Sequence, residues 1–120
     1  MSWLTALAMH HIYCETKKEV IHSVAHSLKL RGLCLVGKPG WVVVIGSKED
    51  VFQFEKTIKR LRWQRIKIMD RRFVEGTDLC PSFEEVGSRL EFEQRMRMHN
   101  LNIVLERISS PFGSSVPLPT

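Results

Sequence analysis

The sequence contains few cysteines, and none of them belongs to a CxxC pair. Cys14, Cys34 and Cys80 are an odd number of well separated thiols, and no signal-peptide pattern precedes them. Regularly spaced cysteines would predict a zinc site or a disulfide framework, whereas scattered thiols are typical of a reducing compartment. We therefore expect the protein in the cytosol or the nucleus.

Long apolar runs are also lacking. The longest stretches, such as "WVVVIG", are far shorter than the roughly 20 residues that cross a bilayer. We therefore expect no membrane role.

The 120 residues suffice for one hydrophobic core, but their charge is unevenly distributed. The composition, 43% hydrophobic and 26% charged, is close to the globular average and predicts a folded domain. The net charge is +5, yet residues 56–72 carry eight Lys or Arg against one acid, a charge of +7, while residues 73–120 carry −3. Such a local positive field favours polyanions or acidic protein surfaces, unless the acidic C-terminal third neutralises it.

The first part of the chain favours a strand followed by a helix. The apolar run Leu7–Cys14 suits a strand, and Thr16 with Glu19 three residues later is typical of a capping box at a helix start. Apolar residues then recur at helical spacing, and Arg31 with Gly32 predicts the helix C-cap.

A hairpin, a second helix and a further strand follow. The letters "GKPG" between two apolar runs predict a turn in which Gly37 or Gly40 has a positive φ. Ser47 and Asp50 repeat the capping signal, and "RIKIM" then alternates strictly between apolar and polar residues. The apolar stripe of this second helix is Val51, Phe54, Ile58 and Leu61. The order βαββαβ predicts an α+β, ferredoxin-like plait over residues 3–76.

A C-terminal helical extension is expected over residues 77–108. Ser82 and Glu85 form another capping pair at the start of a periodic segment that runs to about Met98, and Asn100 is expected to interrupt it. The apolar residues of the extension are Phe83, Val86, Leu90, Leu101, Ile103, Val104, Leu105 and Ile108. They favour a cover over the open face of the sheet, with a partner site as the alternative. Residues 109–120, rich in Ser and Pro, predict a disordered tail.

The densely positive segment of residues 56–72, here called the basic block, supplies the candidate binding residues. Their side chains lie away from the apolar stripe of the second helix or from the apolar face of the following strand, so exposure is expected. These residues are Lys56, Lys59, Arg60, Arg62, Arg65 and Lys67. Trp63 among them is a possible stacking surface, but its place at the helix-to-strand corner favours an anchor. A merely solvated face is the alternative for the whole block.

Two classes of acidic partner fit the basic block, namely a protein with an acidic surface and an RNA. An RNA-recognition motif with this fold stacks bases on aromatic residues of its central strands, and "WVVVI" lacks that pattern. If RNA binds, we expect structured RNA held by phosphate contacts with a steep salt dependence.

Catalysis, metals and cofactors are not expected. Acylphosphatases share the plait but need a glycine-rich loop with an Arg after the first strand, which "CETKKE" does not provide, and "GKPG" lacks P-loop spacing. His10 and His11, as consecutive strand residues, should point to opposite faces, and His22 with His26 lacks the metalloprotease Glu. The prediction is a non-enzymatic protein without cofactor or metal.

Three ordered stretches carry a family resemblance. "HHIYCETKK", "GLCLVGKPGWVVVIG" and "WQRI" resemble the domain of unknown function that follows the RWD domain in the RWD domain-containing protein family. A distant relative of that domain forms the C-terminal part of the spliceosomal pre-mRNA-processing factor three. The resemblance covers about Trp3 to Gly76 and implies a ferredoxin-like fold.

For function, the resemblance implies either of two activities. The related domain of the splicing factor contacts small nuclear RNA, whereas the RWD relatives include protein adaptors. We therefore predict a binding module, with a protein-interaction adaptor ahead of an RNA binder because the aromatic platform is missing. The oligomeric state does not follow from the sequence.

Overall fold

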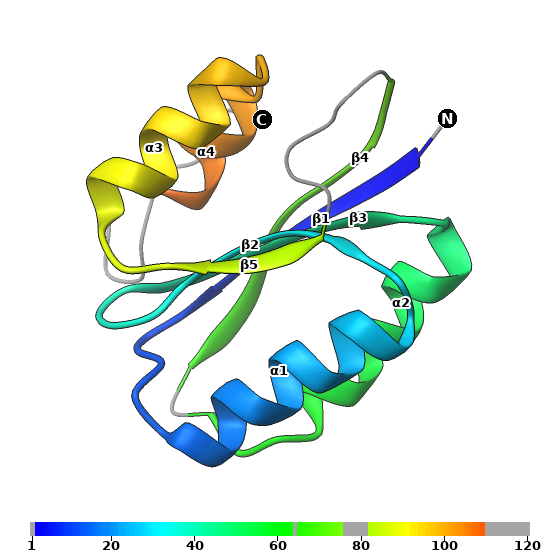
Figure 1. Cartoon of the computed structure of the whole chain (residues 1–120), viewed down its shortest axis with the longest axis vertical. Helices are drawn as coiled ribbons and strands as arrows, with labels where there is room; N and C mark the ends of the chain where they lie inside the picture. Colours follow the sequence, from blue (N-terminus) through cyan, green and yellow to red (C-terminus); the bar gives the residue numbers. More distant parts are fainter. Residues whose placement is uncertain (1, 64, 76–81, 110–120) are drawn as a thin grey trace.

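A computed structural model describes residues 2–63, 65–75 and 82–109 as five strands and four helices (Figure 1). In chain order the elements are β1 (Ser2–Met9), α1 (Glu15–Ser27), β2 (Arg31–Leu35), β3 (Gly40–Gly46), α2 (Lys48–Lys59), β4 (Ile66–Val74), β5 (Phe83–Val86), α3 (Arg89–Met98) and α4 (Asn102–Ile108). The longest helix, α1, has 13 residues, and no helix in these ranges is long and apolar enough to cross a membrane.

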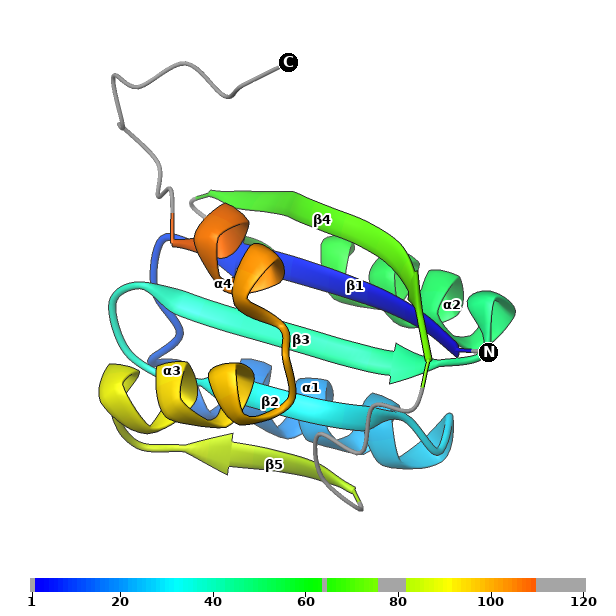
Figure 2. The same cartoon turned by 90° about the horizontal axis from the view of Figure 1, so that it is seen from above.

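The strands form one sheet in the order β4-β1-β3-β2-β5. The pairs β1/β3, β1/β4 and β2/β3 are antiparallel, whereas β5 runs parallel to β2. The first four strands with α1 and α2 are the predicted ferredoxin-like plait, which is therefore confirmed. β5 widens the sheet by one strand that the sequence pattern did not predict. Figure 2 shows β4 and β5 at opposite borders of the sheet.

One face of the sheet is covered by α1 and α2 because both helices carry an apolar stripe. Ile21 and Ala25 of α1 are buried, as are Val51, Phe54 and Ile58 of α2. They pack against strand residues that point to the same side, among them Leu7, Met9, Val42 and Val44. The predicted stripe of α2 is thus confirmed, with Leu61 partly buried just beyond the helix end.

The other face is covered by α3 and α4 (Figure 1). Their buried residues pack on Trp41 and Val43 of β3 and on Leu4 of β1. These residues are Phe92, Met96, Leu101, Val104, Leu105 and Ile108. The predicted cover of the open face is confirmed, and the sheet face on which an RNA-recognition motif stacks bases is occupied by the protein itself.

The prediction for the start of α1 was wrong. β1 ends at Met9, and residues 10–14 form a connection that a single bridge between Ile12 and Gly37 fixes to the β2–β3 hairpin. The helix begins at Glu15 with Cys14 as N-cap in an extended conformation. Thr16 therefore lies inside the first turn, where its backbone is helical, and it does not form the capping box with Glu19.

Gly32 is a strand residue and not the helix C-cap. α1 ends at Ser27, and Lys29 takes the positive φ of 55° that turns the chain toward β2. Gly32 lies inside β2 with a φ of 149°, and a Cβ atom there would sit 1.8 Å from the carbonyl oxygen of Val43. The glycine is therefore required by the close approach of β3, a tertiary cause that local patterns do not reveal.

The predicted helix start at Ser82 was also wrong. Phe83–Val86 is strand β5, with Phe83 packed in the α1/α2 core and Val86 in the α3/α4 core. The cap of α3 is Ser88, whose hydroxyl accepts a hydrogen bond from the Glu91 N–H at 3.1 Å. Leu90, expected in the apolar stripe, is 61% exposed because the helix begins later and presents a different face.

Other local predictions were confirmed. Gly37 has a φ of 114° in the β2–β3 hairpin, and Ser47 caps α2 by accepting from the Asp50 N–H at 3.2 Å. Asn100, with a φ of 59°, separates α3 from α4. α3 and α4 share one core with the sheet. The expected division at residues 76 and 109 stays a prediction, and residues 110–120 of the expected tail lie outside the described residues.

Candidate binding surface

All six predicted basic residues are exposed. Four of them, Lys56, Lys59, Arg60 and Arg62, belong to the C-terminal end of α2 and the turn that follows it. Of the other two, Arg65 directly precedes β4 and Lys67 is its second residue. We call these six residues the basic surface. Only the short connection between α2 and β4 separates the two groups, so the fold brings them to one end of the molecule (Figure 1).

The basic surface extends over both sides of the sheet edge. α2 covers one face of the sheet, whereas Lys67 pairs with Ala8, whose side chain lies in the core beneath α3 and α4. Arg65 lies one residue before β4 and two residues from Lys67, and its carbonyl oxygen accepts a hydrogen bond of 3.1 Å from the His10 N–H, which extends the pairing of β1 with β4 to this residue. The helix bases and the strand bases therefore flank the edge strand from opposite sides and do not form one flat face.

Trp63 anchors this end of the protein. Its Nε1 donates a hydrogen bond of 2.8 Å to the carbonyl oxygen of Ile58, near the end of α2. Its ring is partly buried against the α1/α2 core, and the Lys17 ammonium lies 4.6 Å from the ring centroid. These contacts agree with the anchor interpretation of Trp63 and leave little of the ring for stacking on a ligand.

β4, which carries part of the basic surface, is an edge strand of nine residues. Along the described sheet it pairs with β1 alone, and the register shifts by one residue between Ala6 and Leu7, opposite Ile68 and Asp70. Met69 is the extra residue of this bulge. On the N-terminal side of the bulge, Ile66 and Ile68 face the α1/α2 core. Beyond the bulge, Arg71 and Phe73 face that side, where Arg71 contacts Glu55 of α2 and Phe73 contacts Trp3.

Arg71 holds the edge strand to α2. Its Nη2 donates to Glu55 Oε1 at 2.5 Å and its Nε to Glu55 Oε2 at 3.3 Å, while Thr5 Oγ1 donates to Oε2 at 2.7 Å. Thr5 and Glu55 are buried, so the carboxylate is satisfied inside the protein. The hydrogen bond that Arg71 donates to the Glu55 carboxylate raises the pKa of Arg71 above its ordinary value.

An aromatic cluster lies at the C-terminal end of β4. The rings of Trp3 and Phe73 meet edge to face at a centroid distance of 4.7 Å, and Trp3 meets Phe52 of α2 at 5.9 Å. The Lys48 ammonium lies 5.0 Å from the Trp3 centroid. Phe73 is 55% and Phe52 38% exposed, so the cluster is open to solvent. Sequence patterns missed it, because only the pairing of Trp3 with Phe73 brings distant residues together.

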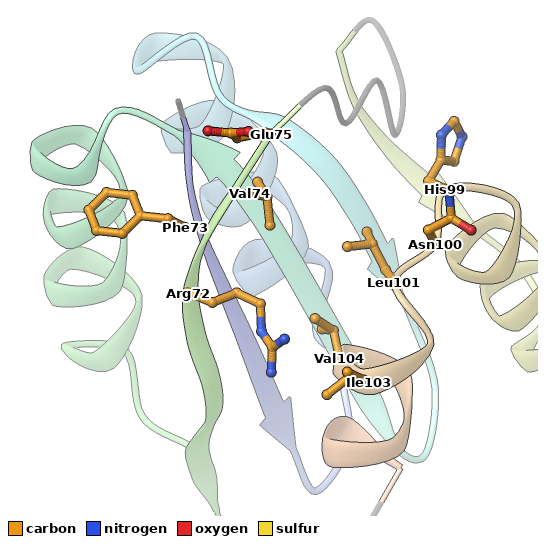
Figure 3. A pocket seen from close by; sticks show the side chains of 9 residues that line it. All are labelled: Arg72, Phe73, Val74, Glu75, His99, Asn100, Leu101, Ile103 and Val104. Atoms are coloured by element: carbon orange, nitrogen blue, oxygen red, sulfur yellow. The ribbon is translucent and has the colours of Figure 1, made fainter.

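A groove of about 290 Å³ separates the end of β4 from the α3–α4 connection (Figure 3). Arg72, His99 and Asn100 bring a guanidinium, an imidazole and an amide to it. The remaining lining residues are Phe73, Val74, Glu75, Leu101, Ile103 and Val104. Arg72 is already paired with the 8% exposed carboxylate of Asp70 at 2.7 Å. The groove therefore offers polar contacts but a largely neutralised cation.

His10 and His11 lie together and do not point to opposite faces of a strand, so that prediction was wrong. Both residues follow the end of β1, and their Nδ1 atoms are 3.1 Å apart. His22, in turn, lies with its Nε2 3.3 Å from Glu85 Oε1 and stacks on His26. Across residues 2–63, 65–75 and 82–109, no three His, Cys, Asp or Glu residues are grouped as a metal site. The absence of a metal stays a prediction.

The two cysteines in the described ranges differ in environment. Cys34 is buried in β2, and this burial raises the pKa of its thiol to about 12. Cys14 is exposed at the N-terminus of α1, where the backbone N–H groups of Lys17 and then Thr16 lower the pKa of its thiol. Cys34 thus behaves as a small buried apolar side chain.

Comparison with protein families gives a match over most of the chain. The family model described as "Small nuclear ribonucleoprotein Prp3, C-terminal domain" matches residues 5–105. The match begins in β1 and ends within α4, so it includes β5 and α3 as well as the plait. The predicted relationship to the splicing factor is confirmed at the level of this family, while the narrower assignment to RWD domain-containing proteins stays a prediction.

Solved structures of similar fold come from proteins of several kinds. Full-length HypF matches with a TM-score of 0.58 and 16% identity over 73% of this chain, which spans 12% of HypF. Acylphosphatase from Bacillus subtilis matches at 0.57 and 15% over 72% of this chain and 99% of its own. Klebsiella pneumoniae BlrP1 matches at 0.71 and 14% over 99% of this chain and 36% of its own. At these identities the similarity concerns the fold alone.

Proposed function

The chain belongs to the small nuclear ribonucleoprotein Prp3 C-terminal domain family, and from this premise we propose that it is a non-enzymatic binding module, a protein-interaction adaptor of the RWD-associated type. Its contact region is the basic surface, and its partner carries an acidic surface. The family description places the related protein in a ribonucleoprotein particle, which favours a nuclear setting for this chain as well.

One observation supports this proposal above the others: exposed bases flank an edge strand while α3 and α4 occupy the broad face of the sheet. A module with this surface can meet a partner at the β4 edge without rearranging its core. Lys59 and Arg62 from one side, with Arg65 and Lys67 from the other, supply a positive field that attracts acidic side chains and speeds association.

The test is co-purification from nuclease-treated extract with charge-reversed variants. Arg65→Glu with Lys67→Glu should lose the partners that the unchanged protein retains, whereas Lys29→Glu with Arg97→Glu should keep them. The control pair makes the same change in net charge at exposed positions outside the basic surface. Retention of all partners by the Arg65/Lys67 variant, with its circular dichroism unchanged, would refute the role of the basic surface.

RNA binding is the second candidate, favoured by the ribonucleoprotein family of the chain. Because the sheet face is covered, the contacts would be made by Lys and Arg with phosphates rather than by stacking. Titration of a structured RNA against a mixed-sequence single strand should then give preference for the structured RNA. The slope of log K against log salt should be about −3 or steeper and flatter in the Arg65/Lys67 variant. Weak binding without preference that disappears near physiological salt would exclude this candidate.

A further inference from the structure

We infer that the outer edge of β4 accepts an extended acidic segment of a partner protein as an additional strand. The inference rests on the proposed function and specifies how the basic surface is used. The segment would pair with the backbone of β4, while its carboxylates meet the bases at the start of the strand and an apolar side chain meets the aromatic cluster at its end. Recognition by strand addition combines backbone hydrogen bonds with side-chain specificity in this way.

The geometry of the sheet supplies the template. β4 has nine residues, pairs on one side with β1, and forms one border of the described sheet (Figure 2). The opposite border is β5, which has only four residues. A long edge strand carries a row of backbone donors and acceptors that can pair with another chain. β4 is therefore the better of the two edges for an added strand.

Charge selects the chemistry of the added strand. Lys67 and the preceding Arg65 are exposed on one side of the edge, and the bases at the end of α2 are exposed on the other. The acid in β4, Asp70, is 8% exposed and lies 2.7 Å from Arg72 and 3.9 Å from Arg107, so it does not offset this field toward solvent. An added strand with acidic residues opposite Arg65 and Lys67 is thus favoured.

The aromatic cluster determines which side chains the partner segment needs at its other end. Phe73 and Phe52 are exposed large apolar side chains beside the last residues of β4, and the Lys48 ammonium lies 5.6 Å from the Phe52 centroid. An apolar or aromatic side chain of the partner placed there would bury both rings. The preferred segment is therefore acidic at one end and apolar at the other.

Two alternatives account for the same edge without a partner segment. A second copy of the chain would pair β4 with β4, but this brings the basic surfaces of the two copies to one seam, which like charges disfavour. The lysine and the bulge at Met69 could instead serve to protect the edge from any pairing. Each alternative gives a distinct result in the experiment below.

The experiment begins with a phage-displayed library of random nine-residue segments selected on the whole protein. We expect enrichment of sequences that are acidic at one end and apolar at the other. The best peptide is then synthesised in three forms: unmodified, N-methylated at its odd residues, and N-methylated at its even residues. N-methylation removes backbone donors and keeps the charges, so one methylated form should bind at least about 10-fold more weakly than the other by fluorescence anisotropy.

A second measurement locates the peptide on the protein. Amide hydrogen exchange followed by NMR should slow at alternate residues of β4 upon binding of the unmodified peptide, because alternate N–H groups of an edge strand point away from its neighbour. Phe73→Ala should weaken binding several-fold, and Arg65→Glu with Lys67→Glu should abolish it. Lys29→Glu with Arg97→Glu should leave it unchanged.

The outcomes separate this inference from the proposed function. Equal binding of both methylated peptides, lost in the Arg65/Lys67 variant, would overturn strand addition and leave the basic surface as a docking site for acidic side chains. No enriched peptide, or slowed exchange of β4 without peptide at raised protein concentration, would overturn it in favour of a protected edge or a β4–β4 dimer. The proposed function fails separately, if the co-purified partners do not depend on the basic surface.

Discussion

Arg71 on β4 and Glu55 on α2 form a two-bonded ion pair, with Nη2–Oε1 and Nε–Oε2 distances of 2.5 and 3.3 Å. Glu55 is 4% exposed, and its second partner, Thr5, comes from β1. The pair therefore joins three elements at the border of the sheet where the basic surface lies. It also explains why Arg71, although part of the dense basic block, serves the fold rather than adding a free charge to the surface.

Loss of Arg71 should destabilise the protein. Arg71→Met leaves the buried Glu55 carboxylate with Thr5 as its remaining described partner, and it should lower the free energy of unfolding by about 1–3 kcal/mol in urea titrations. The lower part of that range is expected because the guanidinium side chain is 44% exposed. Lys67→Met on the same strand is the control and should change stability by less than about 0.5 kcal/mol. Equal stability of the two variants would contradict the structural role of the pair.

Gly32→Ala should prevent folding or cost more than about 4 kcal/mol. The added Cβ would lie 1.8 Å from the Val43 carbonyl oxygen, at a φ of 149° that other residues rarely adopt. Gly87→Ala is the control, because no atom lies within 4 Å of a Cβ built there. Thermal unfolding followed by circular dichroism distinguishes the two. A Gly32 variant as stable as the Gly87 variant would mean that β2 and β3 are not this close.

Phe92→Ala should remove much of the cover over the sheet face. The Phe92 ring is fully buried and meets Trp41 at a centroid distance of 5.3 Å, so its truncation should cost about 3–5 kcal/mol. Leu90→Ala, two residues earlier on α3, should cost no more than about 0.5 kcal/mol because Leu90 is 61% exposed. Urea unfolding monitored by tryptophan fluorescence measures both. If Leu90→Ala lowered the free energy of unfolding more than Phe92→Ala, Leu90 rather than Phe92 would face the sheet, as the sequence pattern predicted.

Stability should fall at alkaline pH through Cys34. Burial raises its folded-state pKa to about 12 from the ordinary thiol value of 9.0, so the unfolded chain loses the thiol proton first. The stabilising contribution is present below pH 9.0 and is lost as the pH rises toward 12, by about 1 kcal/mol at pH 10. Cys34→Ala should show a correspondingly smaller decrease between pH 7.5 and 10. An identical decrease in both proteins would contradict burial as the cause.

Cys14 should react with thiol reagents much faster than Cys34. Cys14 is exposed and its pKa is lowered at the start of α1, whereas Cys34 must be uncovered by unfolding before it reacts. In a Cys80→Ser background, mass spectrometry after brief iodoacetamide treatment at pH 7.5 should find the label on Cys14 at least about 100-fold more often. Comparable labelling of the two residues in folded protein would show that β2 opens readily.

The element order of the plait could be predicted from local pattern because periodicity and turn residues are local. Only the residues of α2 and of the turn before it were needed to predict the apolar stripe of Val51, Phe54 and Ile58 and the cap at Ser47. Local pattern predicted a helix wrongly at Phe83 and Val86, since a spacing of three places residues on one face of a helix but on opposite faces of a strand. Here the two residues fill two different cores, and pairing with β2 decides between the possibilities.

The candidate binding surface, too, could be predicted only in part from the sequence. The exposure of the six bases could be predicted from the faces of one helix and one strand. The cluster of Trp3, Phe52 and Phe73 could not, because it depends on the bulge at Met69, which shifts the register of β4 and turns Arg71 and Phe73 toward α2.

The sequence by itself determined the ferredoxin-like element order, the dense positive charge near the α2–β4 connection and the family to which the chain is related. These properties follow from composition, periodicity and short motifs. The tertiary structure alone decided that β5 joins the sheet, that Gly32 must be a glycine, and that β4 is left as an edge between two sets of bases. Such features arise from contacts between residues far apart in the chain, whose energies no local window of sequence contains.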